Sequence, residues 1–418
     1  MREETPQDSC ATPEKPSVLR VDAARQTILE QVAALQNQQL LPLRNALGRI
    51  LAKAIISPSD VPPHNNSAMD GYAMGHADLT TEATTLRCVG SAFAGKPFSG
   101  QINQGECIRI MTGAILPAGC DTVVMQEQAD HSGDNIRFQG QHQLGQNVRL
   151  AGEDIYHGQT VLKKGRRINA ADLGLLASLG MAEVTVLRRL RVAFFSTGDE
   201  LKSISDSLNP GDIFDSNRYS LYAMLQNAGA DILDMGVVKD DPDALRTALQ
   251  SAADNADLVI TSGGVSVGDA DYIKDLLAEL GQVNFWKIAM KPGRPLAFGH
   301  LDKTPFFGLP GNPVSVMVTF YQFVLPALKK MAGETETAPF LLPAIAAAPI
   351  RKRPGRFEFQ RGVMTSVDGQ LSVSMTGAQG SGILSSMSQA NCFILLDEDC
   401  DGISTGEQVT IQPFAGLI

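Results

Sequence analysis

Residues 261–272 read Thr-Ser-Gly-Gly-Val-Ser-Val-Gly-Asp-Ala-Asp-Tyr and directly follow the apolar run Ala-Asp-Leu-Val-Ile at 256–260. That run is bounded like a buried strand, so glycines, hydroxyls and carboxylates meet where the strand ends. Glycines let backbone N–H groups approach an anion, and a following helix offers its positive N-terminus. The stretch therefore predicts an oxyanion or phosphate site in which Asp269 and Asp271 add metal or proton chemistry. In the alternative interpretation the glycines only turn the chain and Asp269 caps a helix.

The segments around this motif alternate between strand and helix patterns. They are expected in the order strand 191–197, helix 216–228, strand 231–238, helix 241–253, strand 257–261 and a helix ending near Leu280. Such alternation predicts a parallel sheet with helices on both faces, in which ligands bind beyond the carboxyl ends of the strands. The polar residues that follow each strand should therefore meet in one crevice.

Both signs of charge are expected in that crevice. Glu200 and Asp240 follow the first two strands, and paired carboxylates favour Mg²⁺ binding or general acid-base catalysis, although each could be a solvated loop residue. Asp241 precedes a proline and is expected to be an ordinary helix N-cap. Residues 286–295 read Trp-Lys-Ile-Ala-Met-Lys-Pro-Gly-Arg-Pro, which places three cations within eight residues. A further loop, 308–315, has two prolines and opens a helix expected to reach about Lys330.

Composition and length limit the class of protein. The chain has 418 residues, 44% hydrophobic and 19% charged, which suits a soluble globular protein of two to four domains at about 100 to 200 residues each. A formal charge of −10 argues against general nucleic-acid binding. No apolar stretch would span a bilayer, and residues 1–16 resemble a loose polar leader and not a signal peptide, so a cytoplasmic location is expected. The six cysteines and six histidines show no metal-ligand or disulfide spacing.

Outside the α/β segment, the helix and strand pattern of the sequence changes twice. Helical spacing in 17–56 resumes near 165–180, where Asn169 is the expected N-cap. Short alternating segments with frequent glycines lie between them, so a β-rich module is expected as an insertion. From about Pro339 onward, short strand-like runs separated by glycines and prolines predict a terminal β-barrel.

Six motifs resemble one known family. They are Asn-Ser-Ala-Met-Asp-Gly-Tyr-Ala (66–73), Ile-Met-Thr-Gly-Ala (110–114), Ser-Thr-Gly-Asp-Glu (196–200), the opening motif (261–269), Lys-Pro-Gly (291–293) and Gly-Leu-Pro-Gly-Asn-Pro (308–313). Occurring together and in family order, they closely resemble the MoeA-type molybdopterin molybdenumtransferases, whose relatives include the gephyrin E domain. The resemblance covers nearly the whole chain after residue 16.

The resemblance implies insertion of molybdenum from molybdate into the dithiolene of adenylylated molybdopterin, with release of AMP and with Mg²⁺ as cofactor. It also implies an elongated multidomain α/β homodimer with the cleft shared between subunits. The expected domains are a leader (1–16), a linker and dimerisation domain (17–56 with 158–187), a β-rich inserted domain (57–157), a MogA-like parallel-sheet α/β domain (188–338) and a C-terminal β-barrel (339–418). Molybdopterin adenylyltransferase and apo-molybdoenzymes would be its protein partners, with no nucleic acid and no membrane.

Matching motif positions imply the site residues. The catalytic set is Asp154, Glu200, Asp240, Asp271, Lys287 and Lys291. The substrate-binding set is Asp70, Thr112, Ser262, Gly263, Gly264, Ser266, Arg294, Pro310, Pro313, Arg361 and Ser381. Among these, Glu200, Asp240 and Asp271 would hold Mg²⁺ or position an attacking oxygen, and Lys287, Lys291 and Arg294 would attract molybdate and phosphate. Arg294 stands where the family often has Lys, which preserves the charge.

Two other interpretations stay open. A molybdopterin adenylyltransferase would share the central α/β domain, but the modules at 57–157 and 339–418 argue against it. A scaffold resembling the gephyrin E domain would bind partner peptides at a dimer surface. The set of acidic and basic crevice residues favours catalysis over that role.

Overall fold

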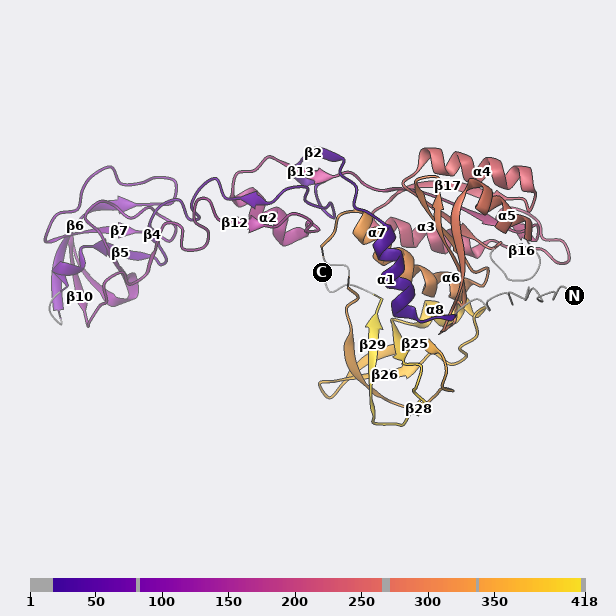
Figure 1. The fold of residues 1–418 in the computed structure, drawn as a ribbon. Helices are drawn as coiled ribbons and strands as arrows, with labels where there is room; N and C mark the ends of the chain where they lie inside the picture. The colour runs from indigo at the N-terminus through magenta and orange to yellow at the C-terminus, as the bar shows by residue number, and fades with distance from the viewer. Residues whose placement is uncertain (1–17, 80–82, 265–270, 336–337, 415–418) are drawn as a thin grey trace, which may run out of the picture.

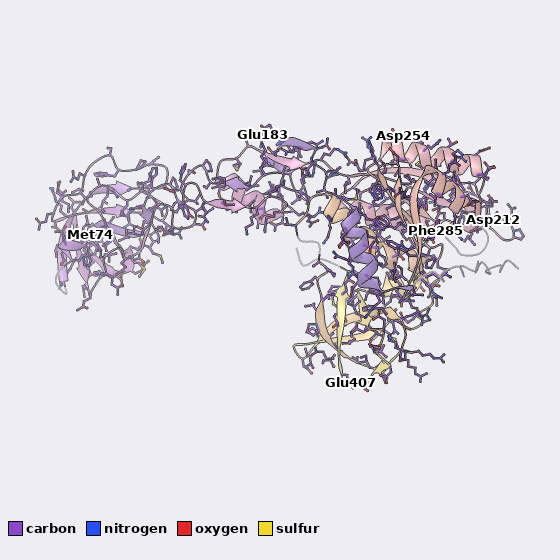
Figure 2. The ribbon with its side chains drawn as sticks, viewed as in Figure 1. Met74, Glu183, Asp212, Asp254, Phe285 and Glu407 are labelled. Carbon is purple, nitrogen blue, oxygen red and sulfur yellow. The ribbon has the colours of Figure 1, made fainter. Side chains whose placement is uncertain are left out.

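A computed structural model describes residues 18–79, 83–264, 271–335 and 338–414. Figure 1 shows an elongated molecule with a β-rich domain at one end and the α/β domain at the other. A thin linker domain joins the two, and the C-terminal domain lies beneath the α/β domain. Figure 2 marks Met74 in the distal β-rich domain, Glu183 in the linker and Glu407 at the base of the C-terminal domain.

A seven-stranded sheet forms the centre of the α/β domain. Its order is β1 (Val18–Leu19), β19 (Gly281–Ile288), β21 (Pro295–Leu301), β22 (Thr304–Leu309), β18 (Leu258–Ser262), β14 (Arg191–Thr197) and β17 (Asp231–Val238). The last four strands run parallel, which confirms the predicted parallel sheet, whereas β21 runs antiparallel to both neighbours. The chain therefore brings the carboxyl ends of β14, β18 and β22 to one edge.

Helices cover both faces of this sheet because its central strands are apolar on both sides. On β14, Val192 and Phe194 pack into one core and Ala193 and Phe195 into the other. The first face is covered by α3 (Ser216–Ala228) and by the continuous helical segment α6 (Pro313–Thr319), η4 (Phe320–Val324) and α7 (Leu325–Met331). The second is covered by α4 (Pro242–Asn255) and α5 (Asp271–Leu280). Asp241 is the expected N-cap, since its carboxylate accepts from the Ala244 amide at 2.9 Å.

The first helix lies differently from the expectation. The sequence predicts that residues 17–56 belong to the linker, but β1 pairs with β19, and the apolar stripe of α1 (Val21–Gln31) packs into the α/β core. Val21, Ala24 and Ile28 are at most 3% exposed there. Helical spacing reveals that a face is buried but not which partner buries it, and this partner is remote in sequence.

The linker domain consists of short paired strands and one helix. β2 (Gln38–Pro42) pairs with β13 (Glu183–Leu187), and β3 (Ile55–Ile56) pairs with β12 (Thr160–Leu162). Helix α2 (Ala170–Ser178) begins after Asn169, whose side chain accepts from the Asp172 amide while the Asp172 carboxylate accepts from the Asn169 amide. This capping box confirms the predicted N-cap.

The inserted domain is a six-stranded sheet with a small core on each face. Its order is β8 (Thr122–Met125), β5 (Gly71–Met74), β7 (Glu106–Ile110), β6 (Ala83–Ala92), β10 (Asn135–Gln139) and β9 (Ala129–Ser132). On β5 the side chains alternate, so Tyr72 and Met74 join one core and Ala73 the other. The expected β-rich insertion is therefore present.

The C-terminal domain is a closed five-stranded barrel. Its strands are β25 (Phe357–Val367), β26 (Gln370–Met375), β23 (Leu342–Ala346), β29 (Gln408–Pro413) and β27 (Cys392–Leu396), and pairing of β27 with β25 closes it. This confirms the predicted barrel. Among the described residues, no helix is both long enough and apolar enough to cross a bilayer.

Candidate functional site

A pocket of about 750 Å³ opens where the carboxyl ends of the parallel strands face the C-terminal barrel. Its lining includes residues from the loops after β14, β17, β18 and β22, from the start of α3, from residues 290–295 and from a barrel loop, 379–381. Loops at a sheet's carboxyl edge are the usual ligand-binding position in α/β folds. A pocket of this size accommodates a ligand of nucleotide-conjugate dimensions.

The Gly263-Gly264 turn forms the floor after β18. Both residues have left-handed backbone, with φ of 92° and 70°. A Cβ on Gly263 would lie 2.5 Å from the Thr197 carbonyl oxygen, so glycine is required there for space as well as for conformation. The turn thus presents bare backbone to the pocket, as the sequence predicted for a site that an anion approaches closely.

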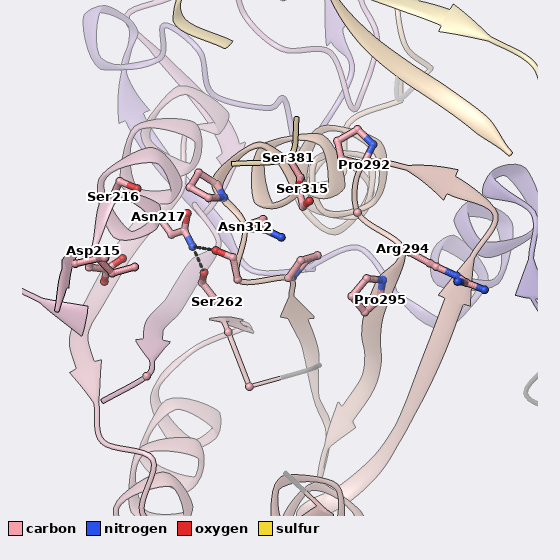
Figure 3. A pocket seen from close by; sticks show the side chains of 18 of the residues that line it. Asp215, Ser216, Asn217, Ser262, Pro292, Arg294, Pro295, Asn312, Ser315 and Ser381 are labelled. Carbon is pink, nitrogen blue, oxygen red and sulfur yellow. Dashed lines mark hydrogen bonds between the residues drawn. The ribbon is translucent and has the colours of Figure 1, made fainter. Parts of the chain in front are cut away.

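Asn217, on the first turn of α3, connects three parts of the site (Figure 3). Its Nδ2 donates to the Ser262 hydroxyl at 2.9 Å and to the Gly311 carbonyl at 2.7 Å. Its Oδ1 and the Oδ2 of Asp215 are buried and have no hydrogen-bond partner among the described residues. Buried polar atoms usually find a partner, so these two oxygens are candidate acceptors for donors on a bound ligand.

Carboxylates gather on one side of the pocket. Glu200 and Asp240 both line it. Burial raises the pKa of Asp240, and repulsion from Asp199 and Glu200 adds to that effect while Thr197 opposes it. Within the described residues no group of three or more His, Cys, Asp or Glu side chains could hold a metal ion. Glu200 and Asp240 thus supply a partial oxygen-ligand set.

Cations occupy the opposite side. Lys291, Arg294 and Arg356 line the pocket, and Figure 3 shows Arg294 extending away from Asn217 and Ser262. Residues 290–291 form strand β20 (Met290–Lys291), which pairs in parallel with β25 of the barrel. The cationic loop is therefore held by the α/β domain and by the barrel together. Separated charges of both signs suit a ligand that has phosphates and also engages a divalent cation.

Arg361 is buried beneath the barrel loop, residues 379–381, and holds it in place through hydrogen bonds. It is 1% exposed and donates to the carbonyls of Gln379 (3.2 Å) and Gly380 (2.9 Å) and to the Ser386 hydroxyl (3.0 Å). Burial among these neutral acceptors lowers the pKa of the guanidinium to about 10. Ser381 lines the pocket at the end of this loop, and its carbonyl accepts from the Val314 amide at 3.0 Å, which connects the loop to α6.

Three family models together match most of the chain. The MoeA N-terminal region (domains I and II) matches residues 19–180, a probable molybdopterin binding domain matches 193–330, and the MoeA C-terminal region (domain IV) matches 343–414. A molybdopterin molybdenumtransferase of Haemophilus influenzae is 45% identical over 404 residues, which cover 96% of this chain and 100% of that protein. The chain belongs to the MoeA family.

Two further relatives agree with this membership. A molybdopterin molybdenumtransferase of Nostoc is 36% identical over 386 residues, covering 90% of this chain and 88% of its own length. The crystal structure of a molybdopterin biosynthesis MoeA protein from Pyrococcus horikoshii superposes with a TM-score of 0.85 at 29% identity, covering 95% of this chain and all of that one. The four-domain arrangement of this MoeA-family chain is thus also seen in a solved structure.

Ten of the predicted site residues line the pocket of this MoeA-family protein. They are Glu200, Asp240, Ser262, Gly263, Gly264, Lys291, Arg294, Pro310, Pro313 and Ser381. Arg361 is not among the lining residues, because it is buried behind the loop it holds. Lys287 is not among them either, since it lies within β19 opposite Pro295. The side chains of Ser266 and Asp271 lie outside what the structure describes, although Asp271 is the first residue of α5.

Of the remaining predicted residues, Asp70 and Thr112 lie in the inserted domain, at the far end of the molecule from the pocket (Figure 1), and Asp154 precedes Ile155, which packs in the linker core. Asp70 and Thr112 are exposed and bonded to each other: Asp70 Oδ1 accepts from the Thr112 amide at 2.7 Å and from its hydroxyl at 2.8 Å. These two bonds lower the pKa of Asp70. Asp154 is exposed in a neighbouring turn. None of these three residues lines the pocket within a single chain of this MoeA-family protein.

Several lining residues were missed from the sequence. They are Asp215, Asn217, Asn312, Ser315, Arg356 and Gln379. The run Phe-Asp-Ser-Asn at 214–217 reads as an N-cap before a helix, and Asp215 does accept from the Arg218 amide. The sequence did offer one sign of this position. The N-cap opens the helix that follows the first strand of the parallel sheet, and such a helix begins at the same sheet edge as the glycine turn.

Proposed function

We propose that this chain is a molybdopterin molybdenumtransferase that moves molybdenum from molybdate to the dithiolene of adenylylated molybdopterin and releases AMP. The observation that best supports it is the pocket itself, in which a bare glycine turn lies between clustered carboxylates and clustered cations. The substrate is a pyrophosphate-linked conjugate and molybdate is a dianion, so both need cationic contacts. Family membership supports the same reaction class.

In this proposal the pocket cations bind the anions, and the buried oxygens of Asp215 and Asn217 orient the ligand. Lys291 offers an ammonium and Arg294 a fork of N–H donors, both suited to oxyanions. Asp215 Oδ2 and Asn217 Oδ1 accept hydrogen bonds from amino or hydroxyl groups of the ligand. Thr197, Ser262 and the glycine turn keep that end of the ligand against the sheet edge.

The carboxylates fit a Mg²⁺ ion. Glu200 and Asp240 line the pocket; burial raises the pKa of Asp240, and repulsion from Asp199 and Glu200, which a cation would relieve, adds to that effect. We propose them as ligands, with Asp271 completing the set. When bound, Mg²⁺ would neutralise phosphate charge and polarise the bond to phosphorus.

Single-turnover release of AMP tests the proposed reaction. The purified protein is incubated with adenylylated molybdopterin, molybdate and Mg²⁺, and AMP and active cofactor are measured. Asp240→Asn should bind the substrate almost as tightly as the native protein but release AMP about 100-fold more slowly. Asp243→Asn, an exposed carboxylate three residues away, is the matched control and should retain full activity.

The outcomes separate this function from its competitors. Undiminished AMP release from Asp240→Asn and Asp271→Asn would overturn the carboxylate assignment. Substrate that stays bound and unchanged on the native protein would indicate a scaffold like the gephyrin E domain. Formation of the adenylylated compound from molybdopterin and a nucleotide would indicate an adenylyltransferase.

We further propose a homodimer in which the inserted domain of one subunit completes the pocket of the other. The inserted domain, which holds Asp70 and Thr112, lies at the far end of the chain from the pocket of its own subunit, and this position supports the proposal (Figure 1). Co-expression of Asp70→Asn with Asp240→Asn tests it, because mixed dimers would then hold one intact site. About a quarter of native activity is expected with random pairing, and no recovery would contradict a shared site.

The partners are proposed on the same basis. Delivery of the substrate by a molybdopterin adenylyltransferase and transfer of the product to apo-molybdoenzymes would place the chain between two proteins. A cytoplasmic location remains a prediction.

A further inference from the structure

A second cavity, of about 1060 Å³, lies on the barrel beside the pocket. We call it the basic groove. Its lining comes from residues 349–356 and 401–405, and it shares Lys291 and Arg356 with the pocket. The two cavities therefore meet at a pair of cations.

The groove is strongly positive in a chain of net charge −10. Its lining contains five cations and two carboxylates: Lys291, Arg351, Lys352, Arg353, Arg356, Glu358 and Asp401. One of the carboxylates, Glu358, is already bonded to Lys291 at 3.5 Å and to Gln360 at 2.9 Å. The positive charge of the groove is thus largely uncompensated.

The cations of the groove differ in their role. Lys352 is 8% exposed, and its ammonium donates to the carbonyls of Glu398 (3.1 Å) and Cys400 (2.9 Å), so no described carboxylate neutralises its charge. It also holds the chain segment that presents its neighbours. Arg351, Arg353 and Arg356 are exposed and form no ion pair with any described residue. Three guanidinium forks are therefore available to a ligand.

We infer that the basic groove is a second anion subsite that binds a phosphoryl group of the ligand held in the pocket. The inference rests on the proposed function, which supplies a substrate with two linked phosphoryl groups. Arginine forks bind phosphate oxygens in pairs, and exposed cations beside a cavity raise the local concentration of anions in an otherwise acidic protein. A ligand that passes Lys291 and Arg356 would leave the pocket directly into this groove.

Isothermal titration with inorganic pyrophosphate tests the subsite without any reaction. The groove variant is Arg351→Gln/Arg353→Gln, in which both exposed side chains lie outside the pocket lining. The control is Lys163→Gln/Lys164→Gln, which removes the same charge from an exposed turn of the linker. The groove variant should weaken pyrophosphate binding by about tenfold, and the control by less than about twofold.

An unchanged isotherm for the groove variant, or equal losses in both variants, would overturn the subsite. A thermal melt of each variant confirms that the fold is intact. For adenylylated molybdopterin, the groove variant should raise KM about tenfold and leave kcat unchanged. Pyrophosphate binding that depends on the groove in a protein that releases no AMP would retain the subsite and reject the proposed function.

Discussion

Lys291 of strand β20 lies opposite Glu358 of strand β25, and its ammonium is 3.5 Å from a Glu358 carboxylate oxygen. The lysine side chain is 48% exposed at the pocket, whereas the glutamate side chain is 8% exposed within the barrel. A buried carboxylate of one domain thus holds a pocket cation of another. The two domains share this short parallel pairing, so the position of the cationic loop depends on how the barrel sits against the sheet.

Glu358→Gln should loosen Lys291 while the strand pairing persists. The amide keeps a hydrogen-bond acceptor but loses the charge that holds Lys291. We therefore expect KM for the anionic substrate to rise by about tenfold and kcat to change less. Steady-state kinetics measure this split. Glu398→Gln, which removes the carboxylate paired with exposed Arg20, is the matched control in the same domain. Equal kinetics for the two variants would contradict a positioning role.

Arg361→Gln should destabilise the barrel loop, because the guanidinium satisfies several carbonyls that would become unpaired. We expect a loss of about 2–4 kcal/mol and weaker ligand binding at Ser381. Thermal denaturation and titration of AMP measure the two effects. Arg356→Gln is the contrast, since this exposed residue lines the pocket and should affect binding with little change in the melting temperature.

Gly263→Ala should damage the site through the backbone. The added Cβ would meet the Thr197 carbonyl oxygen at 2.5 Å, and the left-handed conformation adds about 1–3 kcal/mol of strain. Gly211→Ala is the control, because Gly211 has φ of 98° but open space around its Cβ. Substrate binding should fall in the first variant only; a comparable loss in both would show that the close contact is unimportant.

The Arg188–Asp257 ion pair should make the free energy of unfolding depend on pH in the acid range. Arg188 bonds both Asp257 oxygens at 2.6 Å. Burial pushes the pKa of Asp257 upward, but bonds from Arg188 and from the Arg191 amide outweigh it, so the pKa lies below its ordinary value. The stabilisation is therefore complete above about pH 4, the unfolded value, and is lost as pH falls through the lower folded pKa.

Asp257→Asn should remove that dependence. We expect the variant to be about 1–2 kcal/mol less stable at pH 7 and to lose less further stability than the native protein below pH 4. Melting temperatures between pH 3 and 7 measure both, with Asp254→Asn as an exposed control nearby. Parallel pH curves for the native and Asp257→Asn proteins would contradict the assignment.

Local chemistry made much of the α/β domain predictable. The strands at 191–197 and 231–238 and the helix at 216–228 occupy the predicted positions, because apolar runs, capping residues and glycines act over a few residues. The strand-end rule then located Glu200, Asp240 and the glycine turn in one pocket. The helix at 21–31 was assigned to the wrong domain, since its periodicity is local and its packing partner is not.

The sequence by itself determined the strand-helix alternation, the glycine turn at 263–264 and the charges that follow each strand. Tertiary structure alone decided which of those charges meet. It placed Arg361 behind the pocket, brought Asp215 and Asn217 into it, and kept Asp70 and Thr112 at the far end of the molecule. The physical reason is the sequence range over which each effect acts. Propensity and capping act within a few residues, whereas contacts between the α/β domain and the barrel join residues 67 apart (Lys291 and Glu358) to 378 apart (Arg20 and Glu398), which only packing specifies.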